Sequence, residues 1–186
     1  MYLRFGILLS ALAASLPVSA QSALEDGFSG AIRGCEEWVL NPASWAEGVE
    51  PFIAKTGLGE QMGMVSSVGE ASLPPEELRV ANHYWRINST EEAGYVLVVS
   101  DRLPMCHITG GGNRDLQPVV EALLENADFQ KRWLKVSEKK RGDMITTHFQ
   151  NQTEPDFSMV ISRAKKAGLS QDRVQVIATA TLNLKD

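Results

Sequence analysis

The segment Pro104–Gly112, PMCHITGGG, brings together residue types that could do chemistry. Cys106 stands beside His107, and such a pair could act as a thiol nucleophile with its base or could contribute to a metal site. The three glycines that follow could present backbone amides to an anion. In an oxidising compartment the same cysteine could instead form one end of a disulfide. Which of the four applies depends on the elements that carry these residues.

The neighbourhood of Cys106 argues against a nucleophile that uses the adjacent histidine. Valine-rich segments on both sides indicate that Met105–Thr109 is a β-strand. Neighbouring side chains on a strand point to opposite faces of the sheet, so Cys106 and His107 should face apart. A histidine from elsewhere in the chain could still reach Cys106.

The amino terminus has the pattern of a secretory signal peptide, residues 1–20. Arg4 precedes the apolar run Phe5–Leu16, and the small residues before Gln21 predict cleavage there. The run is shorter than the roughly 20 residues that cross a bilayer, and no later stretch is apolar enough to span. We therefore expect a periplasmic or secreted protein with one domain, residues 21–186, and no transmembrane segment after signal removal.

The two cysteines, Cys35 and Cys106, are expected to form a disulfide. They lie far apart in the sequence and form no CxxC motif, so thioredoxin-like redox chemistry has no support. In an exported protein, two cysteines within one domain usually pair. Cys35 lies on the apolar side of a predicted helix, so the bond should link that helix to the strand of Cys106.

The hydrophobic pattern predicts an α+β domain with a mainly antiparallel sheet of six to seven strands. Two N-terminal helices and one inserted helix should pack mostly on one face, over residues 22–40, over residues 41–57 and from Asp115 onward. Pro51 should kink or split the second helix, and Gly57 should end it. The predicted strands cover residues 82–88, 94–100, 105–109, 132–137, 144–150, 157–163 and 174–184, and a further short run at 62–68 could add one more.

The segment that leads from the strand of Cys106 into the inserted helix is a candidate anion or ligand loop. Its residues are Gly110, Gly111, Gly112, Asn113 and Arg114. Backbone amides at the start of the helix could hold an anion, and the arginine could add charge. The segment lacks the Lys-Ser/Thr of a phosphate-binding loop and the GxGxxG spacing, and the following aspartate would compete for the amides. A flexible turn into an aspartate-capped helix is the favoured interpretation.

Motifs for catalysis, metals and cofactors are lacking, so no catalytic residue, metal ligand or cofactor is assigned. His83, His107 and His148 do not have the spacing of a chelating motif. GxSxG is absent, and a hydrolase would have to use Ser100 and Asp101 at a hairpin tip together with a histidine such as His107.

The formal net charge of −5 argues against nucleic acid as a partner, because non-specific binding to phosphates needs a cationic surface. One segment, KRWLKVSEKKR at 131–141, is instead strongly basic. With Trp133 it could touch anionic lipid headgroups or an acidic partner. The favoured interpretation is a solvated hairpin whose charges discourage edge-to-edge aggregation. The four tryptophans of the chain are expected to anchor the core.

Several positions in the first two thirds of the chain resemble a group of exported proteins. Phe28, Cys35, Trp85, Gly94 and the turn Asp101–Cys106 are laid out as in small exported proteobacterial proteins of uncharacterised function. The resemblance implies periplasmic residence and a disulfide, and it implies no activity.

These observations favour a non-catalytic periplasmic binding or interaction module of the cell envelope, braced by one disulfide. Its partner would be an unknown envelope protein or a small ligand. Two alternatives remain open at this point: a small periplasmic hydrolase, and an inhibitor or immunity-type protein that presents a loop to an enzyme.

Overall fold

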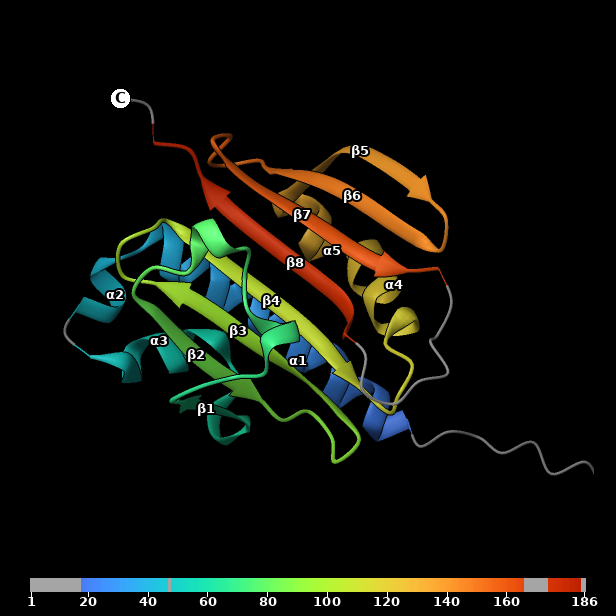
Figure 1. Cartoon of the computed structure of the whole chain (residues 1–186), viewed down its shortest axis with the longest axis horizontal. Helices are drawn as coiled ribbons and strands as arrows, with labels where there is room; N and C mark the ends of the chain where they lie inside the picture. Colours follow the sequence, from blue (N-terminus) through green and yellow to red (C-terminus); the bar gives the residue numbers. More distant parts are fainter. Residues whose placement is uncertain (1–17, 47, 166–173, 185–186) are drawn as a thin grey trace, which may run out of the picture.

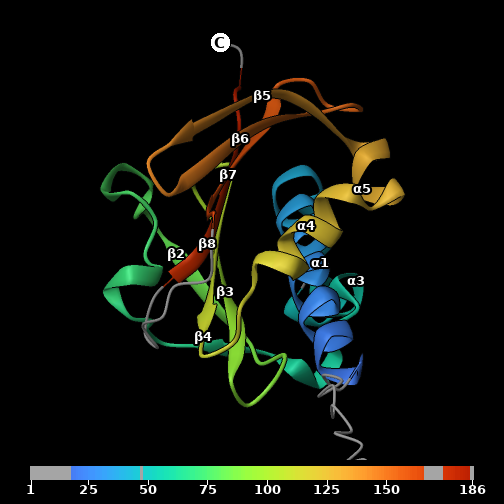
Figure 2. The same cartoon turned by 90° about the vertical axis from the view of Figure 1, so that its right-hand side faces the viewer.

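A computed structural model describes residues 18–46, 48–165 and 174–184. Most of the predicted signal peptide, residues 1–17, lies outside the described residues. The described chain forms one eight-stranded antiparallel sheet with helices on one face, which confirms the predicted α+β class (Figures 1 and 2). The predicted numbers are wrong in detail, because the described residues contain eight strands and five α-helices.

Most elements lie near their predicted ranges, but α1 begins four residues before the predicted helix 22–40, and β5 ends four residues beyond the predicted strand 132–137. The helices are α1 (Val18–Leu40), α2 (Ala43–Ala46), α3 (Val49–Thr56), α4 (Gln117–Glu125) and α5 (Ala127–Arg132), with short 3-10 turns η1 (Gly59–Gln61), η2 (Glu70–Ser72) and η3 (Glu76–Leu78). The strands are β1 (Met62–Val65), β2 (Asn82–Ile87), β3 (Ala93–Ser100), β4 (Met105–Gly112), β5 (Trp133–Arg141), β6 (Met144–Asn151), β7 (Phe157–Ala164) and β8 (Val174–Leu182).

The strand order, β1-β2-β3-β4-β8-β7-β6-β5, divides the sheet into two halves with the same topology. Each half begins with helices and continues into a four-stranded antiparallel meander. The last strand of each meander, β4 or β8, lies at the centre of the sheet, where the two pair antiparallel. The halves are thus related by an approximate two-fold axis that passes between β4 and β8, and this symmetry places both sets of helices on the same face (Figure 2).

The core lies between α1 and the helix-covered face of the sheet. Trp85, Leu97 and Ile108 form one row across β2, β3 and β4 on this face, and all three are buried. Against them α1 presents a buried apolar stripe with helical spacing, which includes Phe28 and Ile32. Helix and sheet approach closely here because Gly34 has no side chain, since a Cβ atom there would lie 3.1 Å from the side chain of Leu97.

A disulfide joins Cys35 on α1 to Cys106 on β4, with 5.4 Å between their Cα atoms, as predicted. Both cysteines are buried. His107 points to the opposite face of the sheet, where its Nδ1 lies 2.9 Å from Oγ1 of Thr179. The prediction that Cys106 and His107 face apart is therefore confirmed, and the described structure contains no free cysteine.

The second predicted helix is split, as Pro51 suggested. The break precedes the proline, and Gly48, with a φ of 141°, is the N-cap of α3. Pro51 occupies the first turn of α3, where its missing N–H would have no partner in the helix. Gly57 ends α3 in the left-handed conformation, with a φ of 72°, as predicted.

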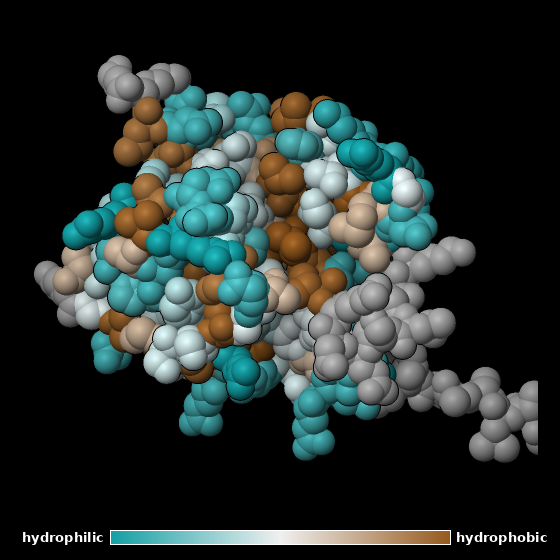
Figure 3. Space-filling view, viewed as in Figure 1, coloured by the Kyte–Doolittle hydropathy of each residue, from teal (hydrophilic) through white to brown (hydrophobic). Residues whose placement is uncertain are grey.

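The sheet face opposite the helices, called the open face below, is only partly covered. Residues 66–81, which contain η2 and η3, cross it over β2–β4 (Figure 1). Hydrophobic surface gathers along the middle of this face (Figure 3), where Val160 and Ile177 are half-buried. Among the described residues, no helix is long and apolar enough to cross a membrane.

Candidate functional site

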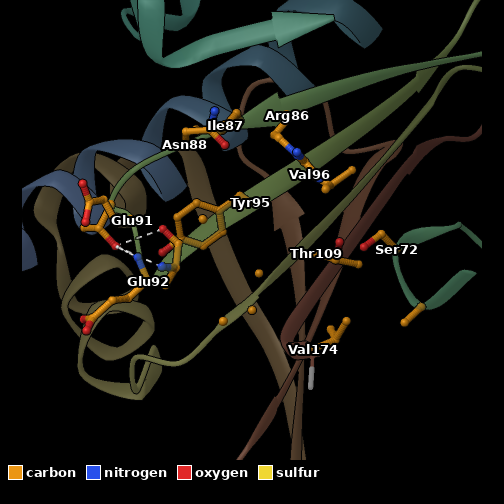
Figure 4. A pocket seen from close by; sticks show the side chains of 17 residues that line it. Ser72, Arg86, Ile87, Asn88, Glu91, Glu92, Tyr95, Val96, Thr109 and Val174 are labelled. Atoms are coloured by element: carbon orange, nitrogen blue, oxygen red, sulfur yellow. Dashed lines mark hydrogen bonds between the residues drawn. The ribbon is translucent and has the colours of Figure 1, made fainter. Parts of the chain in front are cut away.

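A hollow of about 390 Å³ opens on the open face, between the sheet and the crossing segment 66–81. Side chains that line it include Ser72, Arg86, Val96, Thr109 and Val174 (Figure 4). It lies at the end of the sheet where the turn between β2 and β3 meets the last residues of β4. The hollow is therefore lined by β2, β3 and β4 from the first half of the chain and by Val174 of β8 from the second half.

The floor of the hollow is made by glycine. Gly94 on β3 pairs with Gly111 on β4, one row beyond Val96 and Thr109 on the same face. The sheet surface is depressed there because neither residue carries a side chain. Gly94 is also required by its surroundings, since a Cβ atom at this position would collide with the carbonyl oxygen of Ile87.

The walls of the hollow supply polar groups. Ser72 on η2 points toward Thr109 on β4 (Figure 4). Arg86 is exposed, and within the described chain no hydrogen bond or ion pair involves its guanidinium. At the other end, Glu92 forms an ion pair with Arg114, with 2.6 Å between Oε2 and Nε. Arg86 is therefore the cation of this site that is available to a ligand.

The structure corrects the prediction of a flexible turn at the glycine run. Gly110, Gly111 and Gly112 continue β4 and pair with both β3 and β8. Gly110 fits a crowded position, because a Cβ atom there would lie 2.7 Å from both the Tyr95 ring and the Val176 side chain. The glycines serve close packing and the floor of the hollow, and the strand is three residues longer than predicted.

Three of the backbone amides that follow the glycine run donate hydrogen bonds within the protein. Asn113 N donates to the Glu92 carbonyl at 2.7 Å, and Leu116 N donates to the Gln175 side chain at 2.9 Å. Gln117 N donates to Asp115 Oδ1 at 2.9 Å, so the aspartate holds the turn that enters α4, but the N-cap is Leu116 and not Asp115 as predicted. These three amides are therefore not available to an anion. Of the candidate loop, the structure brings only Gly110–Gly112 to the hollow.

Gln175, which was not among the predicted site residues, holds the glycine segment in place. This buried side chain accepts a hydrogen bond from Leu116 N and donates to the carbonyls of Gly112 and Arg114, at 3.1 and 2.6 Å. The available signal was a single glutamine within an apolar strand, Val174–Ile177, where a polar residue needs buried partners.

The residues considered for a hydrolase do not form a triad. Asp101 Oδ2 lies 2.8 Å from Nε2 of His83. The Ser100 hydroxyl, however, donates to the Val80 carbonyl at 2.5 Å and accepts from the backbone of the following turn. His107 bonds to Thr179 on β8 instead. The serine–histidine hydrogen bond that this chemistry needs is not formed by these residues.

The histidines are also dispersed with respect to metal binding. His83, His107 and His148 lie on β2, β4 and β6. The part of the chain that the structure describes contains no group of three or more His, Cys, Asp or Glu side chains that could hold a metal ion.

His107 should make the stability of the protein depend on pH. Burial lowers the pKa of His107 to about 4, from the ordinary value of about 6.5, because its charged form is poorly solvated. Between these two pH values the imidazole is protonated in the unfolded chain but neutral in the folded protein. The free energy of unfolding should therefore fall by about 3 kcal/mol as pH drops from about 6.5 to about 4. Urea unfolding across this range should show the loss, and His107→Gln should flatten the slope. An equal slope in the variant would contradict this assignment.

In the basic segment at 131–141, Trp133 is not available to a lipid headgroup or an acidic partner. Trp133 is buried, and its indole donates to Glu36 on α1 at 2.6 Å. Arg132 forms an ion pair with the same carboxylate. Burial raises the pKa of Glu36, and the attraction of Arg132 opposes the rise. Trp133 thus anchors the core, as predicted for the tryptophans. The exposed residues of the segment are 131, 134–136 and 138–141.

The floor of the hollow is glycine, and its polar lining consists of the guanidinium of Arg86, the side-chain amide of Asn88, the carboxylates of Glu91 and Glu92, and the hydroxyls of Ser72, Thr90, Tyr95 and Thr109. Such a set can bind and orient a small polar ligand, and it lacks an activated nucleophile among the described residues. The disulfide and the helix layer support the opposite face of the same strands. The chain matches no protein-family model, no curated protein and no solved structure.

Proposed function

We propose that the protein is a non-catalytic binding module of the periplasm, and that the hollow on the open face holds a small ligand with a carboxylate or phosphate group. The observation that carries the proposal is Arg86, an exposed cation without a partner in the described chain, at the wall of a glycine-floored hollow. An arginine binds such groups through two parallel N–H donors.

The surrounding architecture suits binding more than turnover. The floor consists of backbone from β3 and β4, two central strands whose other face packs on α1. A rigid scaffold of this kind loses little conformational entropy when a ligand binds. The predicted signal peptide and the disulfide support action outside the cytoplasm.

Substitution of Arg86 should abolish most ligand binding. Losing a hydrogen bond to a charged group costs about 1.5–3 kcal/mol, so Arg86→Gln should weaken affinity by about 10- to 100-fold. Native mass spectrometry of protein purified from the periplasm should show a small bound mass in the parent protein and its loss in the variant. A panel of small carboxylates and inorganic phosphate, read by thermal shift, should identify the chemical class.

Arg102→Gln provides the matched control, because Arg102 is also exposed and lies on the turn between β3 and β4, away from the hollow. It should retain the bound mass. If both variants keep the ligand, or if the parent protein carries none and responds to no anion in the panel, the proposed site is wrong.

A further inference from the structure

We propose that the β5–β6 hairpin is a docking surface for a membrane that contains anionic phospholipid. The hairpin joins β5, at the edge of the sheet, to β6 through the turn at Gly142-Asp143 (Figure 1). The proposal goes beyond the ligand hollow, which lies on other strands, and the two can fail independently.

Exposed apolar side chains concentrate on this hairpin. It carries three of the six large hydrophobic residues that are exposed in the described chain, which are Leu134, Val136 and Met144, with 54, 61 and 43% of their surfaces exposed. Val136 lies in a register shift between Lys135 and Ser137, where a bulge interrupts the pairing with β6. Exposed hydrophobic residues that cluster in this way mark an interaction surface.

Basic side chains surround these apolar residues. Lys135 and Lys140 share the carboxylate of Glu138, and Lys139 and Arg141 have no ion-pair partner within the described chain. The basic charge is unusual in a chain whose formal net charge is −5. A membrane of anionic lipid would therefore attract this edge and repel the remainder of the surface.

The chemistry of the hairpin favours a lipid surface over other occupants. A second copy that paired edge to edge through β5 would bring like charges together, which charged edge strands prevent. Basic residues interspersed with exposed leucine, valine and methionine match the layered chemistry of a membrane interface, where charges meet headgroups and short apolar chains enter the acyl boundary. A strongly acidic protein would pair with the charges but would gain less from the three exposed apolar side chains.

The test is cosedimentation with vesicles of phosphatidylcholine alone and of phosphatidylcholine mixed with about one third phosphatidylglycerol. The mature protein should bind the anionic vesicles and not the neutral ones. Lys139→Gln with Arg141→Gln should weaken binding by about 30-fold, since each cation near such a surface contributes about a fivefold increase in affinity. Leu134→Ser with Val136→Ser should weaken it by about tenfold.

The matched control, Lys55→Gln with Arg102→Gln, makes the same change in net charge outside the hairpin, on α3 and the β3–β4 turn. It should bind as the parent protein does, and so should Arg86→Gln, which separates this surface from the ligand hollow. Equal losses in the two double-charge variants would contradict a hairpin site. Binding to poly-glutamate without binding to anionic vesicles would replace the membrane with an acidic protein partner and overturn the proposal.

Discussion

Replacing both Cys35 and Cys106 with alanine is expected to lower the free energy of unfolding by about 4 kcal/mol. The bond closes a loop of 71 residues, and a long loop loses much conformational freedom in the unfolded chain when its ends are joined. For a domain of this size the melting temperature should fall by about 8–16 °C. Urea unfolding and differential scanning calorimetry of the parent and the double variant measure both quantities.

Reductant supplies the control for this prediction. Both cysteines are buried, with 0 and 1% of their surfaces exposed, so reductant should act only on the unfolded parent protein. It should lower the stability of the parent toward that of the double variant and leave the double variant unchanged. A parent protein that shows two free thiols after gentle unfolding without reductant would contradict the disulfide.

Phe28→Ala is expected to destabilise the fold by about 3–5 kcal/mol, because it removes a large side chain from the densest contact between α1 and the sheet. Phe28 is fully buried and stacks on Tyr95 of β3, with 5.2 Å between the ring centroids. The Tyr95 hydroxyl in turn donates to the Leu24 carbonyl at 3.0 Å, so the ring contact also positions a hydrogen bond between helix and sheet. Urea unfolding at neutral pH gives the change directly.

Leu184→Ala is the control that tests whether the stability lost in Phe28→Ala depends on the burial of the side chain. Leu184 has 72% of its surface exposed, and its truncation should change stability by no more than about 0.5 kcal/mol. A loss below about 1 kcal/mol for Phe28→Ala would mean that α1 does not pack on the sheet as described.

Most of the fold could be predicted from sequence because its strands are short, alternate in polarity and are separated by turn residues. The strands at 82–87 and 144–151 were predicted within one residue at each end. The short helix α5 was missed, since its six residues contain little periodicity. Its signal was Asn126, whose side chain accepts hydrogen bonds from the amides of Asp128 and Phe129.

The hollow could not be predicted, because it depends on which glycines face each other across two strands. Gly94 and Gly111 become neighbours only through the register of β3 with β4. Local sequence favours a turn at three consecutive glycines, and tertiary contacts with Tyr95 and Val176 override that preference. The availability of Arg86 is likewise a property of the whole fold, since it depends on every acidic residue pairing elsewhere or lying out of reach.

The most direct test of the proposed binding function is a crystal structure of the protein purified from the cells that naturally produce it. We expect electron density for a small ligand in the hollow, with an anionic group against the guanidinium of Arg86 and within reach of the Thr109 hydroxyl. An empty hollow in protein that carries a ligand elsewhere, such as between α4 and the β5–β6 hairpin, would contradict the account.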